Sequence, residues 1–259
     1  MTVQAKVGGV TITDGALDIA GAITIGASQA EGVTIGRSGK DVTVNDNLVL
    51  PKTSGVGVKV DTTSPTFGWR DLLGEITIRG SGGTDPSFLT YGGSNIRAFF
   101  FAVNDEVFLA FHIPHDYVPS SDIHLHFHWS QDAKTAAGAA TNPVTGGSVT
   151  WGYEITYAKG HQQAAFSAAV TGTVAQNANT TKDYHHIAEV QVSAASPSAS
   201  QIASGGLEPD GVILCRVYLS ANNMTVSAGA VPAPVLHYCD VHYQSTNMAT
   251  KQKAPNFYS

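Results

Sequence analysis

Residues 123–129, IHLHFHW, place three histidines at alternate positions. Alternate residues of a β-strand lie on one face of the sheet, about 7 Å apart. His124, His126 and His128 would therefore form a row. Zinc binds imidazole nitrogen at about 2.0–2.1 Å, so two adjacent members can converge on one ion, whereas all three can hardly do so. The row makes metal binding and metal-dependent catalysis the first hypotheses.

The strand-like segment PVLHYCDVHYQ near the end of the chain contains further ligand types, because Asp240 and His242 share one face there. His126 and His128, with Asp240 and His242 as candidate partners, could supply a set of two histidines and a carboxylate, as in cupin-type jelly rolls. Cupins also have a Gly-rich spacing with a Glu a few residues beyond the histidine pair. Here Trp-Ser-Gln-Asp and a loop of small residues follow instead. The metal-ligand set is thus only partly present.

The other face of the same segment is apolar. Ile123, Leu125, Phe127 and Trp129 alternate with the histidines and would fill a core. The histidine face would then pack against a symmetry-related copy, because imidazole both donates and accepts hydrogen bonds. We favour this interface interpretation, which predicts no catalytic residue, no bound metal and no cofactor. Nucleophile-elbow, phosphate-loop and zinc-protease motifs are also absent from the sequence, which favours a non-enzyme.

Longer strands that alternate or run apolar dominate the second part of the chain. They are separated by loops poor in large apolar residues, and this pattern predicts an all-β sandwich, specifically a jelly roll. The predicted strands are residues 98–103, 106–112, 122–130, 149–158, 184–192, 211–219 and 234–244.

Residues 1–60 instead repeat a short β-branched unit about every ten residues, as VTIT, ITIG, VTIG, VTVN and LVLP. Strands of three or four residues cannot bury a face alone, so they must stack in a β-helix-like array or interweave with copies of the chain. We predict a trimeric stalk, with an ordinary antiparallel meander as the alternative. Its apolar positions, expected to contact the trimer partners or a capsid, are Val33, Ile35, Val42, Val44, Leu48 and Leu50.

Three regions follow from these changes of pattern. Residues 1–66 would be the β-repeat stalk or capsid-docking region, and residues 67–95 a collar and linker. Residues 96–259 would be the jelly roll with a C-terminal tail that reaches a neighbouring subunit. Within the collar, WRDLLG predicts a single helical turn, with Trp69 packed at the junction.

Composition excludes several classes of function. Charged residues make up 13% of the chain, against about 25% in typical proteins, and the net charge is −6 without a basic cluster. Nucleic-acid binding is therefore not expected. No apolar run reaches the roughly 18 residues of a membrane span, and the first residues lack a secretory signal pattern. Cys215 and Cys239 share no short spacing and are predicted to be buried free thiols, which suits folding in a reducing cytoplasm.

Several motifs together resemble a group of tailed-bacteriophage virion proteins. They are HFHWS at 126–130, VTWGYEITYA at 149–158 and YCDVHYQSTNMAT at 238–250. The segments at 33–61 and 67–74, the latter FGWRDLLG, similarly resemble the stalk and collar of phage structural proteins. The likeness extends over most of the chain.

This resemblance implies a non-enzymatic homotrimer that decorates and cements a phage head, with the major capsid protein as its partner. The protein would lie on the capsid surface after assembly in the host cytoplasm. One alternative is a receptor- or carbohydrate-binding fibre tip, with a host surface glycan as ligand. The other is a cupin-like metalloenzyme that uses the histidine row.

Overall fold

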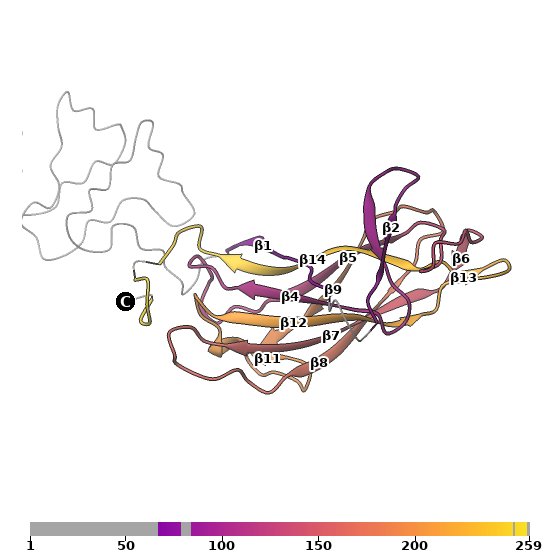
Figure 1. Cartoon of the computed structure of the whole chain (residues 1–259). Helices are drawn as coiled ribbons and strands as arrows, with labels where there is room; N and C mark the ends of the chain where they lie inside the picture. Colours follow the sequence, from indigo (N-terminus) through magenta and orange to yellow (C-terminus); the bar gives the residue numbers. More distant parts are fainter. Residues whose placement is uncertain (1–66, 79–83, 251, 258–259) are drawn as a thin grey trace, which may run out of the picture. The chain divides into compact units, whose positions relative to one another are not determined.

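A computed structural model describes residues 67–78, 84–250 and 252–257 (Figure 1). The predicted stalk, residues 1–66, lies outside these residues together with its six apolar contact positions. The described part of the chain is all-β, and its one helical element is the short 3-10 turn η1, Ser204–Gly206. No helix among the described residues is long and apolar enough to cross a membrane.

Two antiparallel sheets make up most of the fold. The six-stranded one, here called the histidine sheet, has the order β2-β3-β14-β5-β9, with β1 also paired to β14. Its strands are β1 (Gly68–Gly74), β2 (Ser87–Thr90), β3 (Arg97–Phe100), β5 (His124–Gln131), β9 (His186–Gln191) and β14 (Pro234–Ser245).

The four-stranded one, here called the opposite sheet, has the order β4-β12-β7-β8. Its strands are β4 (Glu106–His112), β7 (Ser148–Ala158), β8 (Val170–Asn177) and β12 (Val212–Asn222). Two small two-stranded ladders complete the fold, namely β6 (Val144–Gly146) with β13 (Thr225–Val226), and β10 (Ser193–Ala194) with β11 (Ile202–Ala203).

The two sheets pack face to face around one apolar core. Phe127 and Trp129 of β5 contact Trp151 of β7, with ring centroids 6.0 and 6.4 Å apart. The Trp129 indole also donates a hydrogen bond to Gln176 of β8 at 2.6 Å. Burial of large aromatic side chains from both sheets removes much apolar area from water. The predicted core face of IHLHFHW is confirmed, because all four of its apolar residues are buried.

The seven predicted strands are all present, with ends that shift by a few residues. The strand β8 is not among them. Its sequence, VTGTVAQN, is built of small and polar residues, and its side chains alternate between half-buried and exposed. Pairing with β7 along eight residues, rather than apolar patterning, holds it in the sheet.

The helical turn predicted for WRDLLG is wrong, because these residues lie in β1. This strand pairs antiparallel with β14 over its whole length. Alternation puts Leu72 against the core and leaves Trp69 and Leu73 exposed on the outer face. A Cβ at Gly74 would lie 2.6 Å from the Phe111 ring, so glycine allows the close approach of β1 to the opposite sheet. Tertiary pairing therefore overrides the local helical preference.

The described part of the C-terminal tail packs on its own chain rather than away from it. Phe257 is buried, and its ring contacts the His115 and His161 rings at 5.6 and 5.9 Å. The cysteine prediction is confirmed, since Cys215 and Cys239 are both free and buried. Burial raises the pKa of each thiol, so both are held as the neutral form.

Two leucines of β12 test which face of the opposite sheet is the core. Leu219 is fully buried, whereas Leu214 is 42% exposed on the outer face. We expect Leu219→Ala to lower the free energy of unfolding by about 2–5 kcal/mol, since it leaves a cavity. Leu214→Ala should lower it by less than about 1 kcal/mol. Urea denaturation of both variants measures the difference, and equal losses would contradict the assigned faces.

Candidate functional site

The outer face of the histidine sheet carries the predicted chemistry. The strand β5 lies between β14 and β9, and its register sets which side chains meet. On the β14 side, His126 pairs with Asp240 and His124 with His242. On the β9 side, His126 pairs with Glu189. Residues far apart in the sequence thus become neighbours on one face.

A bulge in β14 adjusts this face at one end. The register with β5 shifts between Leu236 and Tyr238. The inserted residue, His237, contacts Ser130 Oγ through Nε2 at 2.9 Å. Tyr238 stacks on the ring of His128, with centroids 4.0 Å apart. The bulge therefore keeps Leu236 in the core opposite Trp129 while Tyr238 covers the histidine row.

Asp240 lies at the centre of the face and is almost completely buried. One carboxylate oxygen lies 3.2 Å from His126 Nδ1, and the other lies 2.9 Å from His128 Nε2. Burial alone would raise the pKa of Asp240, but its contacts with the two imidazoles outweigh burial and lower the pKa to about 2. Asp240 is therefore an ionised carboxylate at neutral pH.

These contacts are short but poorly aligned. Neither His128 Nε2 nor Asp240 Oδ1 makes a hydrogen bond of normal geometry, although both atoms are buried. Buried polar atoms usually have such a partner, because the loss of hydration is otherwise uncompensated. The centre of the face is thus close-packed without being fully satisfied.

The second nitrogen of each histidine has its own partner. His126 Nε2 donates to Glu189 Oε2 at 2.7 Å, and His128 Nδ1 lies 2.8 Å from His185 Nε2. The contacts of His126 with Asp240 and Glu189 raise its pKa against the opposing effect of burial. Each ring is thereby fixed in orientation, with one nitrogen toward Asp240 and the other toward the outside.

His124 and His242 lie at the rim of this cluster. The Trp69 ring contacts both of their rings, at 5.5 and 5.1 Å. Together with Glu189, these three side chains line a hollow of about 220 Å³. The His242 ring lies 4.8 Å from that of His126, so the hollow adjoins the buried centre.

Two sets of three potential metal ligands, each with its ligand atoms within 4.8 Å of one another, occur among the described residues. One set is His126, His128 and Asp240, all buried. The other is Asp71, His126 and His242, in which Asp71 is exposed. Of the four metal candidates taken from the sequence, three therefore come together around one point, while His242 stands beside them with a different carboxylate.

A single chain does not test whether the histidine row contacts another copy of the protein, so this interface stays a prediction. Side chains of the same chain nevertheless cover much of the row. Tyr238 and His185 stack on His128, and Glu189 contacts His126. Burial of these two histidines therefore does not require a neighbouring copy.

Two members of the site were missed from the sequence. His185 lies just before β9 and contacts His128, a contact that no motif of the sequence indicates. Glu189 lies on a predicted strand, where alternation places it on the face of Ile187 and Gln191. Only the pairing of β9 with β5, which the sequence pattern does not contain, brings Glu189 to His126.

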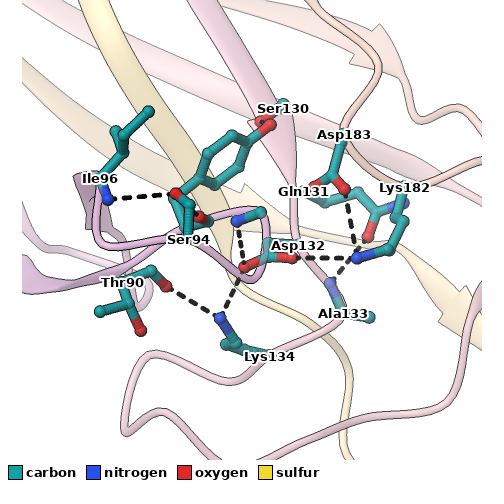
Figure 2. Close-up of polar contacts among 12 residues, drawn as sticks. Thr90, Ser94, Ile96, Ser130, Gln131, Asp132, Ala133, Lys134, Lys182 and Asp183 are labelled. Atoms are coloured by element: carbon teal, nitrogen blue, oxygen red, sulfur yellow. Dashed lines mark hydrogen bonds and ion pairs between the residues drawn. The ribbon is translucent and has the colours of Figure 1, made fainter.

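A second polar cluster lies at the C-terminal end of β5 (Figure 2). Buried Asp132 accepts hydrogen bonds from the Gly92 amide at 3.1 Å and from Lys134 Nζ at 2.7 Å. Lys182 lies 3.5 Å from its other oxygen and 3.2 Å from Asp183. This cluster ties the turn after β2 and the loop before β9 to the end of β5, which is a structural role.

A third cluster gathers histidines around Asp210. His161 and His115 contact its carboxylate through Nε2 at 2.7 and 3.0 Å, and His112 lies at 3.4 Å. His112 and His161 are exposed, and this cluster is not one of the two compact ligand sets found among the described residues.

Comparisons with known proteins identify no family. Neither a protein-family model nor a curated protein matches the sequence. A solved structure of a cycloisomaltooligosaccharide glucanotransferase from Paenibacillus sp., complexed with cycloisomaltoheptaose, is similar at 13% identity with a TM-score of 0.28. The match covers 68% of this chain but only 17% of that chain, and so weak a likeness carries no inference about function.

The Asp132 cluster gives a stability test with a matched control. Asp132→Asn removes the charge that binds Lys134 and the Gly92 amide, so we expect a loss of about 2–3 kcal/mol in the free energy of unfolding. Asp183→Asn alters an exposed ion pair and should change it by less than about 1 kcal/mol. Chemical denaturation of both variants measures these values. If Asp132→Asn left the free energy of unfolding unchanged, the structural role would be refuted.

Proposed function

We propose that this chain is a non-enzymatic virion protein, a homotrimer that decorates and cements the head of a tailed bacteriophage. The observation that carries the proposal is the exposed apolar rim on the outer face of the histidine sheet. Trp69 and Leu73 of β1 lie on one side of the histidine row and are 46% and 67% exposed. Ile187 of β9 lies on the other side and is 46% exposed.

Large apolar side chains grouped on one face of a sheet are typical of protein–protein contact surfaces. A second copy that covers this rim would remove all three side chains from water. We therefore assign the trimer seam to the outer face of the histidine sheet, with the predicted histidine interface at its centre.

The strand order supports the prediction that the fold is a jelly roll. β1-β14-β5-β9 faces β4-β12-β7-β8. This order agrees with the one expected for an eight-stranded jelly roll, in which the first strand lies beside the last one, and jelly rolls recur in viral capsid domains. Fold alone does not determine function, so the motif resemblance and the apolar rim carry the remainder.

In this proposal the N-terminal repeats dock on the major capsid protein and the jelly rolls form an outer knob. Binding that buries surface across neighbouring capsomers stabilises the assembled shell by mass action. The chemistry is recognition alone, without a substrate.

The oligomeric state is the first test. Sedimentation equilibrium of the full chain at micromolar concentration should give three times the 27.0 kDa chain mass. Glutamates at both sides of the row, in Leu73→Glu/Ile187→Glu, should weaken association more than about tenfold, since two apolar contacts become buried charges. Leu214→Glu on the opposite sheet is the matched control. A monomeric wild type would refute the trimer, and an unimpaired double variant would refute this seam.

Capsid attachment is the second test. Particles that lack the protein should bind the purified full chain in many copies and resist heat better once coated. A chain without residues 1–60 should lose this binding while its circular dichroism retains the β signal of the knob. Intact binding by the truncated chain would show that docking does not reside in the repeats.

A further inference from the structure

We propose that His126, His128 and Asp240 bind one divalent transition-metal ion, for which zinc is the best-matched candidate. The ligand atoms would be His126 Nδ1, His128 Nε2 and a carboxylate oxygen of Asp240. Two histidines and one carboxylate are a common ligand set for such ions. The site is independent of the proposed virion function, because it lies within one chain.

The distances suit an ion. A tetrahedral zinc site with ligands at about 2.0–2.1 Å separates its ligand atoms by about 3.3 Å. The Asp240 oxygens lie 3.2 and 2.9 Å from the two imidazole nitrogens, and all three ligand atoms lie within 4.8 Å of one another.

The outer contacts are those that metal-bound histidines normally have. A ligating imidazole usually directs its other nitrogen to a carboxylate or another polar group, which fixes the tautomer and the ring orientation. Glu189 takes this place for His126, and His185 takes it for His128. Both histidines are buried, so their rings are already held in place.

A bound cation also resolves what the protein atoms alone leave unsatisfied. His128 Nε2 and Asp240 Oδ1 are both buried without a hydrogen bond of normal geometry. An ion at the centre takes the lone pairs of both atoms. With neutral imidazoles, a divalent charge also balances the carboxylates of Asp240 and Glu189, whereas uncompensated buried charge is costly.

A hollow lies on the solvent side of the proposed site. The hollow lined by Trp69, His124, Glu189 and His242 adjoins His126 from the solvent side. Three protein ligands leave one position of a tetrahedral ion for water. Because the ligands come from β5 and β14, the ion would join two strands that are far apart in the sequence.

The test uses the full chain with any affinity tag removed and metal stripped by a chelator. Equilibrium dialysis with zinc, followed by elemental analysis, should give one ion per chain with a dissociation constant of micromolar or lower. Cobalt(II) should produce the intense visible absorption of a four-coordinate site. Absence of stoichiometric binding by the folded wild type would overturn the proposal.

Substitutions of single residues test which side chains bind the ion. Asp240→Asn and His128→Gln should each weaken zinc binding at least 100-fold. Glu189→Gln keeps all three ligands and has a half-exposed side chain, so it should fold and bind about 10–100-fold more weakly. Asp210→Asn in the other histidine–carboxylate cluster is the matched control and should bind normally.

If Asp240→Asn fails to fold, Glu189→Gln and the control decide the question. Unchanged zinc affinity in Glu189→Gln, or loss of the stoichiometric ion in Asp210→Asn, would overturn the assignment. Zinc should also raise the melting temperature of the wild type but not that of His128→Gln, which separates specific binding from loose surface binding.

Discussion

The pairing of β5 with β14 is the constraint on which the rest of the structure depends. The same eight-residue strand supplies Phe127 and Trp129 to the core and His126 and His128 to the outer face. A slip of one residue would exchange the two faces and put imidazoles into the apolar core. The bulge at Leu236–Tyr238 allows β14 to satisfy both demands, since Leu236 stays opposite Trp129 while Asp240 stays opposite His126.

A buried carboxylate on the outer face is an unusual consequence of this register. The outer face of an antiparallel sheet is commonly solvated, yet Asp240 is only 2% exposed. Its charge must be compensated locally, because the transfer of a carboxylate out of water costs several kcal/mol. The imidazoles of His126 and His128 provide this compensation and hold the pKa of Asp240 at about 2. Glu189 and His185 then fix the imidazoles from the other side.

Alternation along the sequence predicted much of this site and could not predict the rest. It assigned both faces of β5 and placed Asp240 and His242 on one face of β14, because period two is a local property. It gave no information on which strands are neighbours, so the contact of Glu189 with His126 was not foreseen. The same limit explains β1 and β8. WRDLLG suits a helical turn in isolation and becomes a strand only beside β14, while β8 has almost no apolar pattern of its own.

A physical reason makes two features compatible on one face, namely the buried cluster around Asp240 and the exposed apolar rim. A protein seam that had to neutralise Asp240 would leave an uncompensated buried charge in each free chain before association. Here His126 and His128 contact both of its oxygens within the chain, so the free chain can fold with this face complete. Association on this face could then draw on Trp69, Leu73 and Ile187, whose burial is favourable without any change in protonation. The histidine row would thus shape the seam and hold its strands together, while the apolar residues beside it supply the free energy of contact.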